Sequence, residues 1–99
     1  MPNAFRGVWD YVDGTCNPAS DLRLEIGADS IEFYESIGQI SNIKIRSPQQ
    51  VVVKLDMEGE GERWEMTRMF TLDRNGERLT PSAVGDDQFT PMPLKRCPE

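Results

Sequence analysis

The chemistry open to this chain rests on carboxylates, arginines and two cysteines, because its 99 residues include no histidine. Histidine is the commonest general base, the commonest metal ligand and the usual pH switch near neutrality. A Ser-His-Asp or Cys-His nucleophile is therefore excluded within one chain. Cys16 and Cys97 could not complete a zinc site, which needs four ligands. We expect no metal and no cofactor.

Glu35 and Arg68 are the charged residues whose positions suggest binding chemistry. Strand alternation would place Glu35 on the same face as Phe33, and Arg68 on the same face as Trp64. A charge buried alone is costly, so an inward Glu35 would need a cation. Arg68 is the natural partner, with Tyr34 or Tyr11 close by if a bulge alters the alternation.

Two interpretations of this pair stay open. The charges form a structural ion pair or reach water at strand ends, or they lie at the mouth of a cavity and hold the head of a small amphipathic molecule. For the second interpretation we expect the ligand site to comprise Glu35, Arg68, Tyr34 and Trp64. Catalysis by Glu35 ranks last, since glycosidase chemistry needs a second carboxylate and none is evident.

Two acidic segments, residues 56–65 and 73–77, surround glycine turns. Neither has oxygen ligands at the offsets that a calcium loop requires. We interpret both as acidic hairpin tips. Such tips could also dock a cationic protein, so inhibition of a cationic hydrolase is the alternative function to ligand binding.

The elements that must position these residues are strands, because the hydrophobic pattern has a period of two. No ten-residue window carries a helical stripe. Turn residues separate the alternating runs, and Asn75-Gly76 is the strongest signal, typical of a type I′ hairpin. The other turns expected are at Asp13-Gly14, Gly27 with Asp29, Gly38, Ser47-Pro48 and Gly59-Glu60-Gly61. The expected strands are 22–26, 31–37, 42–46, 51–57, 63–72 and 94–97.

This spacing predicts an all-β fold, a small antiparallel up-and-down β-barrel of about eight short strands, formed by a single domain of residues 1–99. The segment 81–93 contains three prolines and few apolar residues. We expect it to be an irregular loop, either a connection or a lid, that leads to the last strand.

Cys16 and Cys97 allow three interpretations: a disulfide, two buried free thiols, or a reactive thiol. A disulfide that closes a loop of this length would stabilise the fold by about 4.5 kcal/mol in the chain-entropy treatment. It would also indicate an oxidising compartment such as the periplasm.

Gly7-x-Trp9 near the start and Arg96 near the end resemble the end-closing arrangement of the lipocalins and the wider calycin group. The resemblance implies that Trp9 packs across one end of the barrel beneath Arg96, and that Gly7 allows close backbone approach. It also implies a lipocalin-like barrel that is closed by its first and last strands. Cysteines just after the first strand and at the end of the last would fasten that seam.

The chain also resembles a group of short, uncharacterised exported bacterial proteins with the pattern G-x-W, C, FYES-x-G, W, T, L and RC. This similarity brings no known activity. It implies export to the periplasm or the medium, with a leader that is absent from this chain.

The net charge is −6, and no stretch concentrates lysine and arginine. Nucleic acid and anionic membrane surfaces are therefore disfavoured as partners. No apolar run approaches the roughly 18 residues of a membrane helix. We expect a non-catalytic binding protein whose partner is a small apolar or amphipathic ligand or, alternatively, a cationic protein.

Overall fold

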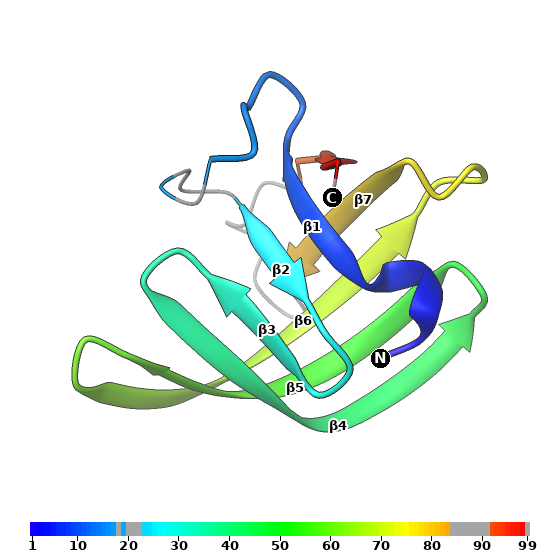
Figure 1. Cartoon of the computed structure of the whole chain (residues 1–99). Coiled ribbons are helices and arrows are strands. Elements are labelled where there is room, and N and C mark those ends of the chain that lie inside the picture. The colour runs from blue at the N-terminus through cyan, green and yellow to red at the C-terminus, as the bar shows by residue number, and fades with distance from the viewer. Residues whose placement is uncertain (18, 20–22, 84–91, 99) are drawn as a thin grey trace.

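A computed structural model describes residues 1–17, 19, 23–83 and 92–98 of the chain (Figure 1). A short 3-10 helix precedes eight antiparallel strands. The elements are η1 (Asn3–Phe5), β1 (Gly7–Tyr11), β2 (Leu24–Ile26), β3 (Ser30–Phe33), β4 (Ser36–Ser47), β5 (Gln50–Gly59), β6 (Glu62–Leu72), β7 (Arg78–Ala83) and β8 (Leu94–Arg96). Each strand pairs with the next, and β8 pairs with β1, so the sheet closes into a barrel. The predicted all-β, up-and-down barrel is confirmed.

The seam between the first and last strands is held by both backbone and covalent bonds. Trp9 lies opposite Arg96 in the ladder. Beyond it, the Cys97 N–H donates to the carbonyl of Val8 at 2.8 Å. A disulfide joins Cys16 to Cys97, with 6.0 Å between the two Cα atoms. The disulfide interpretation of the two cysteines is therefore confirmed.

A buried carboxylate shapes the loop that carries Cys16. Asp10 is fully buried, and its carboxylate accepts hydrogen bonds from the N–H of Tyr11 at 2.8 Å and of Cys16 at 3.0 Å. Charge-assisted bonds to backbone N–H groups offset the cost of burying the carboxylate. Asp10 thus holds the Cys16 backbone close to the end of β8, where Cys97 lies.

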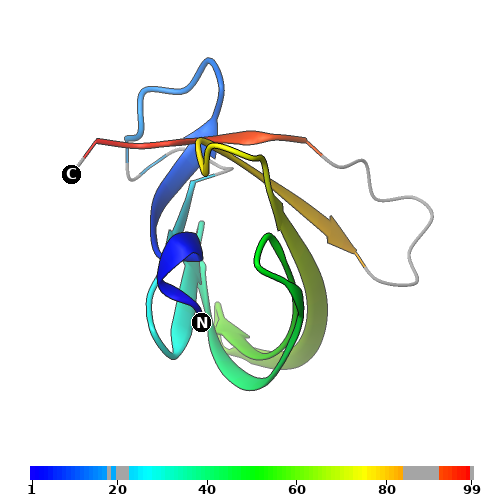
Figure 2. The ribbon, with the colours of Figure 1, turned by 90° about the vertical axis from the view of Figure 1, so that its right-hand side faces the viewer.

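The two ends of the barrel differ. At one end η1 places the fully buried Phe5 in the core, and the Met1 amino group donates to the carbonyl of Ala28 at the β2–β3 turn at 2.9 Å. Figure 2 views the molecule from this side and shows η1 in front of the barrel. The tips of the β3–β4 and β5–β6 hairpins project at the other end, on the left of Figure 1.

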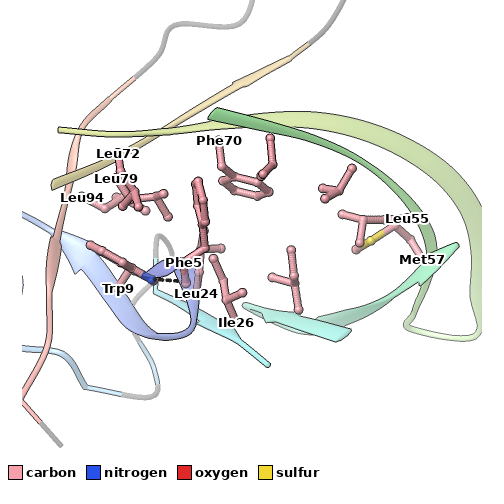
Figure 3. Close-up of a cluster of buried hydrophobic side chains, with 13 residues drawn as sticks. Phe5, Trp9, Leu24, Ile26, Leu55, Met57, Phe70, Leu72, Leu79 and Leu94 are labelled. Atoms are coloured by element: carbon pink, nitrogen blue, oxygen red, sulfur yellow. Dashed lines mark hydrogen bonds between the residues drawn. The ribbon is translucent and has the colours of Figure 1, made fainter. Parts of the chain in front are cut away.

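The core follows the predicted alternation most closely in β5. Its residues Val51, Val53, Leu55 and Met57 are all buried. Figure 3 shows how Phe5, Trp9, Leu72 and Leu79 gather at one end of this core, with Leu55 and Met57 at the other. Burial of such side chains at about 25 cal/mol per Å² is the main stabilising term of the fold.

The prediction of one strand over residues 31–37 is wrong. Phe33 pairs with Ser36, and the residues between them form a two-residue turn that separates β3 from β4. Glu35 adopts a positive φ of 59° in that turn. The alternation of apolar and polar residues continues through the turn, so it concealed the reversal.

Gly38, predicted as a turn, lies within β4 and is buried. A Cβ atom there would lie 2.6 Å from the Met57 sulfur and 3.2 Å from a Leu55 methyl carbon. The glycine therefore serves packing between β4 and β5 and not a change in chain direction.

Three further expectations need correction. Residues 81–83, predicted as irregular, belong to β7, while the rest of the predicted loop up to residue 91 lies outside the described residues. Ile45, an apolar position of the predicted strand 42–46, shares a face with the buried Val51 opposite it but is 61% exposed near the end of β4. In the β6–β7 turn only Gly76 has a positive φ, so Asn75-Gly76 does not form a type I′ turn.

Candidate functional site

The closed end of the barrel is built on Arg96. Its guanidinium carbon lies 4.1 Å from the centre of the Trp9 ring. The same guanidinium donates to the carbonyls of Ala4 at 2.8 Å, Arg6 at 2.9 Å and Gly76 at 3.2 Å. Trp9 is fully buried, and its indole N–H donates to Phe5 at 3.0 Å (Figure 3). One side chain therefore ties η1, β1 and the β6–β7 turn together.

Gly7 makes room for this arrangement. It has a φ of 127°, which a residue with a side chain rarely adopts, and a Cβ atom there would lie 3.1 Å from an Arg96 nitrogen. The structure thus brings together Gly7, Trp9 and Arg96, the three residues that the sequence singled out for the end of the barrel.

The other half of the barrel contains a cavity of about 250 Å³. Apolar side chains from several strands form most of its wall, and Arg68 and Ser36 are the polar residues among those that line it. The remaining lining residues are Leu24, Phe33, Met57, Trp64, Met66, Phe70, Pro81, Met92 and Leu94. Trp9 and Phe5 occupy the interior at the closed end, so the cavity in the other half of the barrel is the best candidate for a ligand site.

Arg68 reaches this wall from the middle of β6, where it lies opposite Val53 of β5 and Ala83 of β7. Its guanidinium donates to the Thr67 carbonyl at 3.2 Å, and it takes part in a further interaction. The side chain is partly buried. A guanidinium on an otherwise apolar wall suits an acceptor such as a carboxylate, which it can bind through two parallel N–H groups.

Glu35 and Tyr34 lie elsewhere. Both are exposed at the β3–β4 turn, and within the described part of the chain no ion pair joins Glu35 to Arg68. The expected pairing of these two charges is therefore wrong, because Glu35 belongs to a turn and not to the inward face of a strand. Trp64 lines the cavity with Arg68, but it also borders a second hollow that contains Tyr34 and Glu35.

This second hollow, of about 260 Å³, lies between the tips of the β3–β4 and β5–β6 hairpins. We call it the tip hollow, and its lining residues are Tyr34, Glu35, Ser36, Gly59, Glu60, Glu62 and Trp64. The hairpins approach closely, since a Cβ atom on Gly59 would lie 2.6 Å from the carbonyl oxygen of Glu35. Ser36 and Trp64 border both the tip hollow and the cavity.

Two carboxyl groups meet in the tip hollow. A hydrogen bond to Glu35, together with its charge, raises the pKa of Glu60 above its ordinary value. Glu60 and Gly61, with φ of 52° and 79°, form the two-residue turn between β5 and β6. This backbone conformation holds the Glu60 carboxyl beside the neighbouring hairpin.

Sequence reasoning missed Ser36, Pro81 and Met92 as cavity residues and Glu60 as the neighbour of Glu35. Ser36 could have been found if the turn after Phe33 had been recognised. Pro81 and Met92 fall in the segment predicted to be irregular, where no alternation predicts whether a side chain points into the barrel. The closeness of Glu60 to Glu35 depends on how two hairpins pack, which alternation does not encode.

The acidic turn at Asp73 also departs from a calcium loop. Its carboxylate accepts hydrogen bonds from the N–H groups of Glu77 at 2.8 Å and Arg78 at 3.2 Å. Desolvation acts to raise the pKa of Asp73, but these donors, Gly76 and the Arg78 charge lower it overall. The carboxylate thus organises the β6–β7 turn. Among the described residues no cluster of three or more potential metal ligands occurs.

No helix within residues 1–17, 19, 23–83 and 92–98 combines the length and hydropathy needed to cross a membrane. Comparisons with protein-family models, with curated proteins and with solved structures found no match to this chain. We therefore infer the function from the cavity and the residues that line it.

Proposed function

We propose that this protein is a non-catalytic, lipocalin-like carrier that binds a small amphipathic ligand in the open half of its barrel. The apolar part of the ligand occupies the cavity, and an acidic head, most simply a carboxylate, binds Arg68. The single observation that carries this proposal is the apolar cavity of about 250 Å³ with a guanidinium on its wall.

The volume limits the size of the ligand. A dry protein cavity of about 150 Å³ holds benzene, which has six carbons. Scaled by volume, the present cavity of about 250 Å³ holds an apolar group of about ten carbons. This favours medium-chain or compact aromatic acids over long lipids.

The disulfide supports an exported location. A bond between Cys16 and Cys97 persists in oxidising compartments and is uncommon in reducing ones. We therefore place the function in the periplasm or outside the cell, where a carrier would meet small amphipathic acids before they enter it.

The test is a calorimetric titration with straight-chain carboxylic acids of increasing length and with the matching alcohols. Each buried CH₂ contributes about 0.8 kcal/mol, so the affinity should rise about fourfold per carbon and level off near ten carbons. A charge-assisted hydrogen bond contributes about 1.5–3 kcal/mol, so each acid should bind roughly ten- to a hundredfold more tightly than its alcohol.

Arg68→Met should abolish the preference for the acid while keeping the dependence on chain length. Arg78→Met is the matched control, because Arg78 is exposed on β7 and does not line the cavity. An affinity that does not depend on chain length, or an acid preference that survives in Arg68→Met, would overturn the proposal.

A further inference from the structure

The tip hollow presents two exposed aromatic side chains at the open end of the barrel. Tyr34 is 44% exposed and Trp64 is 41% exposed, and they come from different hairpins. Their presence in one hollow places two aromatic groups within reach of a single incoming group. An exposed aromatic pair of this kind indicates a contact site, since large aromatic side chains are favoured at binding surfaces.

The charge around the aromatic pair selects the occupant. Glu35, Glu60 and Glu62 line the same hollow. Within the described part of the chain none of these three carboxylates has a lysine or arginine at ion-pair distance. On the same hairpin, by contrast, Glu65 pairs with Lys54 at 3.3 Å and Glu58 lies 4.0 Å from Arg63.

Aromatic faces and carboxylates attract the same kind of group. An ammonium is attracted to the faces of Trp and Tyr, and carboxylates accept its N–H bonds. A hollow that combines both is complementary to an alkylammonium group. The net charge of −6 would also attract a cationic partner from a distance.

We propose that the tip hollow is a docking site for a lysine side chain of a cationic partner protein. A free amine fits less well, because small-ligand sites bury most of their ligand and the residues that line the tip hollow are mostly exposed. A lysine on a protein arrives with surrounding surface that covers the aromatic faces and excludes water. Both hairpin tips project from the barrel, so a flat protein surface can reach them (Figure 1).

The tip hollow and the proposed ligand cavity are lined by different charged residues. Arg68 lines the cavity but not the tip hollow, whereas Glu35 and Glu60 line the tip hollow but not the cavity. Substitutions of these acidic residues therefore test the lysine site without altering the cavity wall.

The experiment is an NMR chemical-shift titration of the full chain with three probes. They are the blocked tripeptide Gly-Lys-Gly, the same tripeptide with norleucine in place of lysine, and n-butylammonium. The expected dissociation constant for the lysine peptide is on the order of millimolar, as for a single cation–π group with exposed ion pairs. It should bind at least fivefold more tightly than the other two probes and shift the indole signal of Trp64.

The double variant Glu35→Gln/Glu60→Gln should lose the preference for lysine over norleucine. Glu25→Gln/Glu32→Gln is the matched control, because these exposed carboxylates lie directly opposite each other on β2 and β3, away from the tip hollow. It changes the net charge equally and should keep the preference.

Equal binding of the lysine and norleucine peptides would overturn the proposal. So would n-butylammonium binding as tightly as the lysine peptide, because the site would then serve small amines. An equal loss in the Glu25→Gln/Glu32→Gln control would show only general attraction to the acidic surface and would also overturn it.

Discussion

Replacing Arg96 by methionine should destabilise the barrel far more than removing any other exposed or partly exposed charge. The substitution keeps much of the aliphatic volume but removes the guanidinium that lies 4.1 Å from the Trp9 ring. It also removes the donors to the carbonyls of Ala4, Arg6 and Gly76. These carbonyls connect η1 and the β6–β7 turn to the last strand.

The magnitude follows from those four contacts. A partly exposed cation–π contact contributes about 1 kcal/mol. The three hydrogen bonds contribute about 0.5–1 kcal/mol each, since exposed carbonyls regain water when the donor is lost. The free energy of unfolding should therefore fall by about 2.5–4 kcal/mol, a large part of the stability of a small domain.

Urea denaturation followed by the fluorescence of the buried Trp9 measures this loss. Arg96→Lys should recover less than half of it, because an ammonium lacks the planar fork that reaches three carbonyls at once. Arg78→Met is the control and should change stability by about 0.5 kcal/mol or less, since this side chain is exposed, donates to the Glu77 carbonyl next to it and interacts with the exposed Asp73 through its charge. A loss under 1 kcal/mol in Arg96→Met, or full recovery in Arg96→Lys, would refute this account of the closed end.

Two further predictions concern the hairpins at the open end. Gly38→Ala should lower the free energy of unfolding by about 1–3 kcal/mol, because the new methyl group displaces Met57 and crowds Leu55; chemical denaturation checks this, and an unchanged midpoint would show that the site is not tightly packed. Glu60→Gln should stabilise the protein at pH 7 but not at pH 3. Glu35 raises the pKa of Glu60 above the ordinary 4.5, so the folded state holds that proton more tightly than the unfolded chain. The free energy of unfolding of the wild type therefore falls as the pH rises from the ordinary pKa of 4.5 through the raised pKa of Glu60, and Glu60→Gln, which does not ionise, does not show this fall. Thermal melts across this pH range measure the difference, and a difference that is equal at both pH values would contradict the assignment.

The closure of the barrel could be predicted because its determinants are chemically distinctive. Cysteines near both ends and an arginine beside the last of them indicated that β1 and β8 are neighbours. Alternation then assigned the buried face of β5 correctly, since no bulge or turn interrupts the ladder between β5 and β6 over its whole length.

The candidate site was predicted less well, because it depends on turns that the pattern concealed. The β3–β4 turn uses Tyr34 and Glu35, with a positive φ at Glu35, although neither residue is a glycine, asparagine or proline. Gly38 was misread because a glycine needed for packing looks the same in sequence as a glycine needed for a turn. As a result Arg68 was expected to face Glu35, whereas Arg68 lies on the cavity wall and Glu35 lies beside Glu60.

Ligand binding in the cavity is tested most directly through the methionine methyl groups, because three of the methionines line the cavity. Met57, Met66 and Met92 line the cavity, whereas Met1 packs against the core near η1 and Met69 points away from the cavity on β6. In methyl NMR spectra, titration with a ten-carbon acid should shift the signals of Met57, Met66 and Met92 and leave those of Met1 and Met69 in place. No shift in the three cavity methyls at saturating acid, or shifts confined to Met1 and Met69, would contradict ligand binding in the open half of the barrel.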